Sequence, residues 1–168
     1  MRALAVSLSL FVVIGCGAAA PRPLALTPAE AAPAAPPLAF DLLAGGTWAS
    51  AQHAGQVIVV DVWASYCEPC KKAFPQLNVL AADPRLAVVG VSIDEEDAAA
   101  AAFLAQVPAR FPIARDPAVS VATPPLSIAQ VPTVLVIDRA GRLRLRLDDA
   151  TAADYAALPE LLAPLLAP

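Results

Sequence analysis

The chain has 168 residues, of which 11 are basic and 15 are acidic, so its formal net charge is −4. One folded domain is the expectation at this length. Hydrophobic residues make up 58% of the chain but aromatic residues only 5%, which predicts a modest core built largely from small side chains. The only basic pair is Lys71-Lys72. We therefore set nucleic-acid binding aside, because it needs a basic stripe or arm.

The first 15 residues have the pattern of an export signal. One arginine precedes an apolar run over 3–14, which suits a signal peptide and is too short to span a bilayer. The sequence VIGC at 13–16 resembles the lipobox of bacterial lipoproteins. This resemblance implies that Cys16 is lipid-modified and anchors an exported protein to a membrane from the periplasmic side. The alternative is an ordinary signal peptide, residues 1–15, with an incidental cysteine after it.

A tract rich in proline and alanine follows, over residues 16–37. It has no periodic apolar face, and its prolines cannot donate backbone hydrogen bonds. We predict a lipid-anchored, extended tether here. The folded domain is then expected to occupy residues 38–168.

The first half of this domain predicts two buried strands and a helix between them. Residues 56–63 and 85–93 are near-continuous apolar runs, as in strands covered on both faces of a parallel sheet. Helical composition follows Cys67, with Pro69 in the first turn, where its missing N–H costs nothing. Pro75 lies inside this helix and should kink it.

Further elements follow in order. Asp94 is a candidate N-cap for a helix over 95–107. Residues 133–138 and 142–147 read as a hairpin around a turn.

A last helix is expected to start at a Thr151 cap with Asp154 and to end near Leu166. Pro159 and Pro164 should bend or break it. The order of all elements implies an α/β sandwich with parallel central strands and an antiparallel final pair.

Chemistry concentrates where the first long strand meets its helix. Cys67 and Cys70 lie two residues apart on the first helical turn, where they can close a small disulfide ring. The helix dipole and free N–H groups stabilise a thiolate at the first of them. Cys67 is therefore the expected nucleophile and Cys70 the resolving thiol. Alternatives are half of a zinc site, for which His53 is the only histidine, and a structural disulfide.

This stretch, WASYCEPCKKAFP over 63–75, resembles the thioredoxin superfamily and within it the membrane-tethered ResA/TlpA type of reductase. The resemblance extends to VGVSID at 89–94 and to VPTVLVID-x-x-G at 131–141, and covers essentially all of 38–168. It implies a thioredoxin-like three-layer sandwich, with a central mixed β-sheet and helices on both faces.

The same resemblance implies a substrate-binding surface. In the family the proline of the VPT motif is cis and lies beside the cysteines, which here is Val131-Pro132. Its role would be to expose the backbone of Val131 for strand-like pairing with a bound substrate chain. Trp63 and Tyr66 are the expected apolar shelf of the site, with plain packing as the alternative.

Two positions depart from the closest pattern. Ala73 stands where ResA-type sequences have a glutamate. Asp61 stands where many of the tethered group carry asparagine, and where thioredoxins carry a buried aspartate. We infer that Asp61 is the general acid/base for Cys70, with a pKa raised by burial. Between the cysteines, Glu68 and Pro69 are expected to tune the couple, since a carboxylate beside the thiolate favours a reducing couple.

The resemblance implies an enzyme: an extracytoplasmic thiol:disulfide oxidoreductase that reduces disulfides in exported proteins, with apocytochrome c as a candidate client. A membrane thiol-reductase of the DsbD/CcdA kind would supply electrons by analogy. No cofactor or metal is expected beyond the Cys67–Cys70 disulfide, and a monomer is expected.

Three other functions remain open. An oxidant that installs disulfides would use the same residues in reverse. A peroxidase of the peroxiredoxin type needs a threonine where Ala64 stands. A thioredoxin-like copper chaperone needs three residues between its cysteines and a histidine far downstream, whereas His53 lies upstream.

Overall fold

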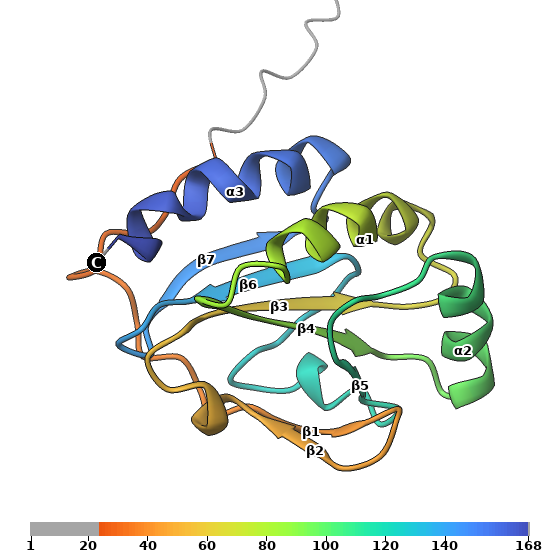
Figure 1. Cartoon of the computed structure of the whole chain (residues 1–168). Coiled ribbons are helices and arrows are strands. Elements are labelled where there is room, and N and C mark those ends of the chain that lie inside the picture. The colour runs from red at the N-terminus through yellow and green to blue at the C-terminus, as the bar shows by residue number, and fades with distance from the viewer. Residues whose placement is uncertain (1–23, 168) are drawn as a thin grey trace, which may run out of the picture.

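The computed structural model describes residues 24–167. A seven-stranded mixed sheet in the order β2-β1-β5-β4-β3-β6-β7 runs through it (Figure 1). The elements in chain order are β1 (Ala39–Leu42), β2 (Thr47–Ala49), η1 (Ser50–His53), β3 (Val57–Trp63), α1 (Glu68–Leu80), β4 (Leu86–Ser92), α2 (Asp97–Gln106), β5 (Ile113–Arg115), η2 (Ser120–Ala122), β6 (Thr133–Ile137), β7 (Leu143–Asp148) and α3 (Ala152–Leu166).

The centre of the sheet has the predicted directions. Strands β3, β4 and β5 run parallel, whereas β6 is antiparallel to β3 and β7 is antiparallel to β6. Every residue of β3 and β4 is buried, because both faces of the sheet are covered. The two central strands and the hairpin expected from the sequence are confirmed.

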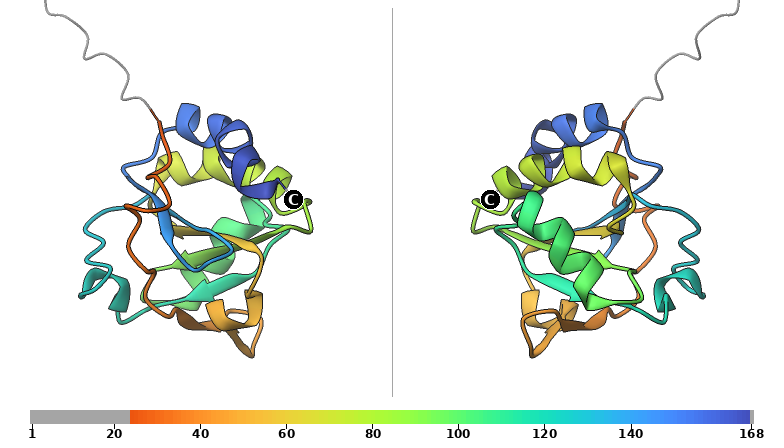
Figure 2. Two further views of the ribbon diagram at one scale, coloured as in Figure 1. Left: turned by 90° about the vertical axis from the view of Figure 1, so that its left-hand side faces the viewer. Right: turned by 90° about the vertical axis from the view of Figure 1, so that its right-hand side faces the viewer.

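One face of the sheet carries the α-helices. Helices α1 and α3 lie side by side over it, and α2 closes one end (Figures 1 and 2). Trp63 of β3 packs against Phe74 of α1 and Phe103 of α2, with ring centroids 5.0 and 4.6 Å away. A Cβ on Gly90 of β4 would lie 3.1 Å from the Trp63 indole nitrogen and 3.0 Å from Phe111, so a side chain there would require these rings to shift.

The opposite face is covered without a long helix. Leu38, Trp48, Val121 and Leu126, from the N-terminal hairpin and the segment before β6, pack against the alternate side chains of the central strands. The helical turns on this face are the short 3-10 helices η1 and η2. The three-layer thioredoxin-like architecture is therefore confirmed. Among the described residues, the helices on the second face are only these two short 3-10 turns.

Two helix starts show different outcomes. Helix α3 begins at the predicted capping box, in which the Thr151 backbone N–H and side chain both donate to Asp154. It runs unbroken through Pro159 and Pro164, and α1 likewise runs through Pro75. The expected Asp94 cap is wrong: α2 starts after Glu96, which makes no side-chain cap hydrogen bond.

Residues 24–37 correct the predicted tether, because they pack along the edge strand β7. The N–H of Thr27 donates to the Arg144 carbonyl (2.7 Å), and the N–H of Leu143 donates to the Pro33 carbonyl (2.9 Å). The Arg142 guanidinium also donates to the Ala32 carbonyl (2.9 Å). A proline-rich segment can pair with a strand edge because its carbonyls still accept hydrogen bonds. The domain therefore begins by residue 24.

The predicted signal peptide and the predicted lipid anchor at Cys16 lie outside the described residues. Within 24–167, none of the helices is both long enough and apolar enough to cross a membrane.

Candidate active site

The two cysteines lie where β3 passes into α1. Cys67 is the N-cap of α1 and forms a disulfide with Cys70 in its first turn. The N–H of Cys67 donates to the Ala64 carbonyl (3.0 Å), which fixes the turn that leads into the helix. Cys67 is 5% exposed and Cys70 is fully buried. Of the two cysteines, only Cys67 therefore reaches solvent. This difference is consistent with Cys67 as the nucleophile and Cys70 as the resolving thiol.

Asp94, just beyond β4, anchors this turn. Its carboxylate accepts the Ser65 N–H (3.0 Å) and the Ser65 hydroxyl (2.7 Å). It also accepts the Ser92 hydroxyl (2.8 Å), and the side chain is 8% exposed. The ends of the two parallel strands are thereby tied together directly beneath the loop that carries Cys67.

Replacement of Asp94 by asparagine should loosen this turn. We expect a fall of about 2 kcal/mol in the free energy of unfolding, because hydrogen bonds to a buried charge are lost. Hydrogen exchange at the Ser65 amide should accelerate as well. Urea unfolding and exchange measured by mass spectrometry test both effects. The control is Asp97→Asn, which removes only an exposed ion pair with Arg115 and should cost less than about 1 kcal/mol; equal costs would contradict the anchoring role.

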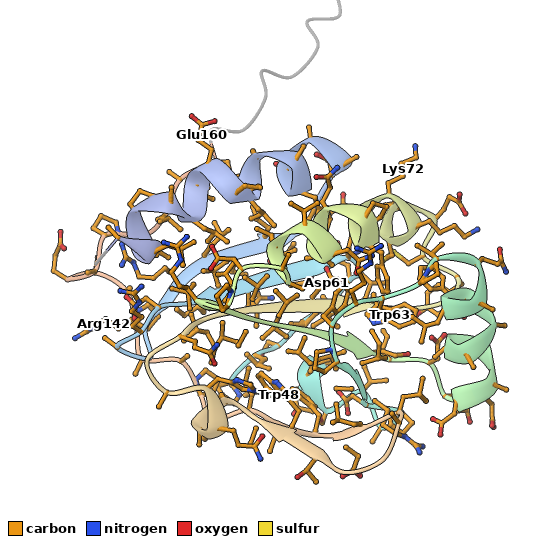
Figure 3. The ribbon with its side chains drawn as sticks, in the orientation of Figure 1. Trp48, Asp61, Trp63, Lys72, Arg142 and Glu160 are labelled. Atoms are coloured by element: carbon orange, nitrogen blue, oxygen red, sulfur yellow. A yellow bond between two sulfur atoms is a disulfide. The ribbon has the colours of Figure 1, made fainter. Side chains whose placement is uncertain are left out.

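Asp61 lies in β3 on the side of the sheet that α1 covers (Figure 3). It is two residues from both Val59 and Trp63, so it faces the same core as they do. It is fully buried, and its Oδ1 accepts a hydrogen bond from the Tyr155 hydroxyl of α3. Burial raises the pKa of Asp61 from 3.8 to about 7, and the Tyr155 hydrogen bond lowers it by a smaller amount. A carboxyl that titrates near neutral pH can both take and return a proton.

The residues between the cysteines are solvated. Glu68 forms an ion pair with Lys71 (2.8 Å), and the hydrogen bond and charge of Lys71 lower the pKa of Glu68. Pro69 is exposed in the first turn of α1, and Lys72 points away from the protein (Figure 3). The influence of Glu68 on a thiolate at Cys67 is therefore screened by solvent and by its lysine partner.

The predicted apolar shelf divides in two. Tyr66 is 73% exposed beside Cys67, where a substrate can reach it. Trp63 is fully buried in the aromatic cluster of the core, so its predicted contact with substrate is wrong and its role is packing. The Val131-Pro132 peptide bond is cis as expected, with Val131 half-buried and Pro132 buried.

Tyr155 was not identified from the sequence. The available signal is the spacing of Tyr155, Leu158, Leu162 and Leu166, which is one helical face and predicts a buried phenol. A buried tyrosine hydroxyl normally finds a partner. The sequence does not say which of the acidic residues that partner is.

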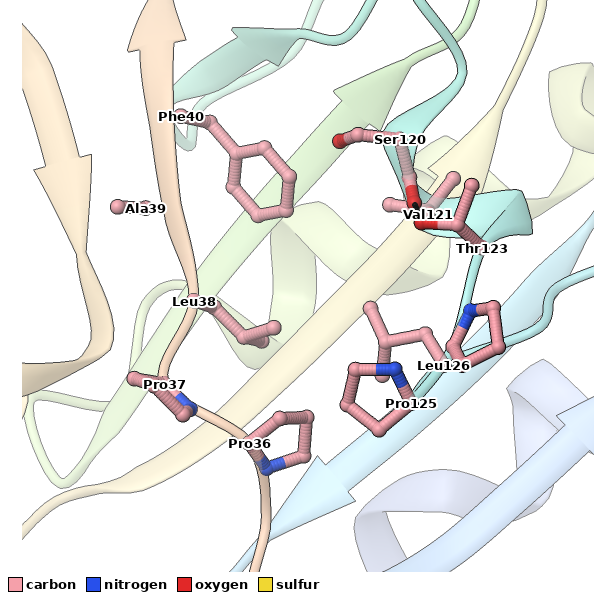
Figure 4. A pocket seen from close by; sticks show the side chains of 11 residues that line it. Pro36, Pro37, Leu38, Ala39, Phe40, Ser120, Val121, Thr123, Pro125 and Leu126 are labelled. Carbon is pink, nitrogen blue, oxygen red and sulfur yellow. Dashed lines mark hydrogen bonds between the residues drawn. The ribbon is translucent and has the colours of Figure 1, made fainter.

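Other polar features lie away from the dithiol. His53 stacks on Trp48, with ring centroids 5.2 Å apart, on the face opposite α1. Within residues 24–167 no three His, Cys, Asp or Glu side chains are grouped as a metal site would require. A groove of about 160 Å³ between Phe40 and the Pro124-Pro125 turn is also on that opposite face and is not lined by either cysteine (Figure 4).

A pair of cysteines two residues apart at the start of α1, together with a buried carboxyl in the adjoining strand of this mixed sheet, defines a thioredoxin-like dithiol protein. Residues 31–146 match the AhpC/TSA family, and the chain belongs to that family.

Two curated relatives are named as thiol-disulfide exchange proteins. The chain is 26% identical over 92 residues to the thiol-disulfide oxidoreductase ResA of Bacillus cereus, an alignment that covers 53% of each chain. It is 36% identical over 88 residues to the thiol:disulfide interchange protein DsbE homolog of Paracoccus denitrificans, over 52% of this chain and 48% of that one. The chain thus spans about half the length of the curated relatives it matches. The resemblance inferred from the motifs is confirmed.

Solved structures agree with the fold. A Chlorobium tepidum protein assigned as the thiol:disulfide interchange protein DsbE superposes with a TM-score of 0.74 at 32% identity, over 81% of this chain and 97% of that one. A secreted Mycobacterium tuberculosis disulfide oxidoreductase superposes with a TM-score of 0.65 at 22% identity, over 76% and 95% of the two chains. The second comparison bears on the fold alone.

Proposed function

We propose that the protein is an extracytoplasmic thiol:disulfide oxidoreductase that reduces disulfides in exported proteins. The observation that carries this proposal is the inequality of the two cysteines. Cys67 caps the helix and keeps some exposure, whereas Cys70 is fully buried in the same core as Asp61's partner, Tyr155. The names of the relatives support the same reaction class.

In the reduced protein the Cys67 thiolate attacks one sulfur of a substrate disulfide. A bond forms between Cys67 and that sulfur, and the second substrate sulfur leaves as a thiolate and takes a proton. Cys70 then gives its proton to the Asp61 carboxylate and attacks the Cys67 sulfur. The bond between Cys67 and the substrate breaks, and that substrate sulfur leaves as a thiolate and takes a proton from water. The substrate thereby gains two electrons, and the protein ends with the Cys67–Cys70 disulfide.

Return to the dithiol requires two electrons from another dithiol. We propose a membrane thiol-reductase of the DsbD/CcdA kind as that donor, and apocytochrome c as a candidate among the substrates. Lipidation at Cys16 would hold the domain at the membrane where such a donor acts. Tyr66 and the Val131-Pro132 turn are the proposed contacts for an incoming peptide.

The reduction potential of the Cys67–Cys70 couple tests the direction of electron flow. The full chain is equilibrated in dithiothreitol buffers of graded potential, and alkylation of the peptide that carries both cysteines reports the reduced fraction. A potential near or below that of thioredoxin, about −270 mV, is the expected result for a reductase. A potential near −120 mV, roughly that of the strong oxidants, would reverse the proposal and make the protein a source of disulfides.

Peroxide turnover is the remaining enzymatic alternative. Ala64, three residues before Cys67, is fully buried and carries no hydroxyl. The same preparation is therefore expected to reduce a protein disulfide and to leave hydrogen peroxide unconsumed; rapid peroxide consumption would favour a peroxidase instead.

A further inference from the structure

A single contact joins the last helix to the proposed proton acceptor. Tyr155 is 1% exposed and Asp61 is fully buried, and the phenol hydroxyl of Tyr155 donates to Asp61 Oδ1 across 94 residues of sequence. Tyr155 lies in the second turn of α3, which packs against α1, the helix of the two cysteines.

This contact makes the two oxygens of the carboxyl unequal. Oδ1 is occupied by the tyrosine hydroxyl, whereas Oδ2 is buried and has no hydrogen-bond partner in the part of the chain that the structure describes. Burial and the charge of Asp61 raise the pKa of Tyr155 far above its ordinary range, so the phenol keeps the proton that it donates to Oδ1. While Tyr155 donates to Oδ1, a proton on that oxygen would clash with the tyrosine proton, whereas Oδ2 has no such neighbour among the described residues. This geometry assigns the proton that Asp61 exchanges to Oδ2.

We propose that Tyr155 is a positioning residue, which holds the Asp61 carboxyl in one orientation and assigns the exchanged proton to Oδ2. This inference rests on the proposed function, in which Asp61 serves Cys70. When Cys70 attacks the mixed disulfide, its proton passes to Oδ2 while Tyr155 stabilises the carboxylate charge that precedes transfer. When the disulfide is reduced again, Oδ2–H returns the proton to the Cys70 sulfur.

Few other charges act on this pair. The residues paired with Asp61 in the neighbouring strands are Gly90 in β4 and Val134 in β6. Val134 is paired in turn with Leu147 in β7, and none of these three side chains titrates.

Helix α1 contributes the two cysteines to this core, and its Glu68–Lys71 ion pair lies at the surface. Helix α3 contributes Asp154, whose charge acts on Tyr155 and which caps the helix. Asp148 accepts a hydrogen bond from the Thr133 hydroxyl. Thr133 shares its face of β6 with Leu135 and Ile137, which is the other side of the sheet from Asp61. Tyr155 is therefore the one group among the described residues that hydrogen-bonds to the carboxyl.

The test is an infrared pH titration of the oxidised full chain, in which the carbonyl band of protonated Asp61 is followed. Tyr155→Phe keeps the ring and removes the hydroxyl. Because the lost hydrogen bond favoured the carboxylate, the midpoint should rise by about one pH unit, and the carbonyl band should move to higher frequency. Asp61→Asn identifies the band by removing it. Tyr66→Phe, which removes an exposed hydroxyl, should leave the midpoint unchanged.

A perturbation of opposite sign guards against a folding defect in Tyr155→Phe. The chain has two tyrosines, so 3-fluorotyrosine incorporated into the Tyr66→Phe protein labels Tyr155 alone. The fluorinated phenol is a stronger donor, and it should lower the midpoint. Unchanged midpoints in both the phenylalanine and the fluorotyrosine proteins would overturn the role of Tyr155.

The pH dependence of exchange separates this inference from the function on which it rests. The rate at which a mixed disulfide with glutathione is resolved should follow the infrared midpoint in each protein. If Asp61→Asn resolves it at the wild-type rate at every pH, the proposed role of Asp61 fails. If Asp61→Asn is slow and Tyr155→Phe has the wild-type profile, only the positioning role fails.

Discussion

Serine in place of Cys67 is expected to lower the rate of disulfide reduction more than about a thousandfold, because the thiolate is the nucleophile and a hydroxyl in its place is not ionised. Serine in place of Cys70 should have a different result. Cys67 can still attack, but no second thiol resolves the intermediate, so a mixed disulfide accumulates. With oxidised glutathione as substrate, mass spectrometry of the intact chain detects this adduct directly.

The matched control is Cys16→Ser, which also replaces one cysteine by serine and leaves both site cysteines in place. It should reduce disulfides at the wild-type rate in detergent solution. A stable adduct in Cys67→Ser, together with loss of attack in Cys70→Ser, would show that the roles of the two cysteines are reversed.

The elements that sequence patterns predicted well are those fixed by local chemistry. The β-branched run of β3 can be buried on both faces only in the middle of a sheet, and the Thr151–Asp154 capping box completes its hydrogen bonds within four residues. Cys67 and Cys70 also belong to this class, since their spacing alone brings the sulfurs within reach of one another.

The elements that sequence patterns missed depend on distant partners. Asp94 has the chemistry of an N-cap, but an aspartate can equally accept the Ser65 N–H from a neighbouring strand end, and only the fold decides between them. Trp63 stands beside the motif, yet its ring packs in the core next to Gly90, where a side chain would crowd it. Tyr155 meets Asp61 only because α3 returns to the face that α1 covers.

The prediction of a tether for the proline-rich segment was wrong for a different reason. Composition correctly indicates that residues 24–37 cannot form a core of their own, but Ala32 becomes buried because the edge of β7 offers partners for its neighbours. The arginines of β7 complete this contact, since Arg144 donates from its side chain to the Thr27 carbonyl (2.6 Å). A tract without internal periodicity can still be ordered by an exposed strand edge.

Asparagine in place of Asp61 is expected to stabilise the oxidised protein at alkaline pH while it slows exchange. The folded-state pKa of Asp61 is raised from 3.8 to about 7, so between these values the folded state holds a proton that the unfolded chain has lost. The free energy of unfolding therefore falls as the pH rises through this window. About three pH units at about 1.4 kcal/mol each set the upper limit of the loss near 4 kcal/mol. Asparagine has the same shape and no charge to bury, so this loss is absent.

Urea unfolding of both oxidised proteins at intervals from pH 4 to pH 8 measures the effect. The two stabilities should be similar at pH 4 and should diverge in favour of the variant toward pH 8. Asp116→Asn supplies a control of opposite sign, because the buried carboxylate of Asp116 accepts the N–H groups of Ser120 and Val121 (2.9 Å each), and its charge strengthens those bonds. That variant should be less stable than the wild type. Parallel pH curves for Asp61→Asn and the wild type would mean that burial of this carboxyl costs the fold nothing, and the basis for its role as a proton acceptor near neutral pH would be lost.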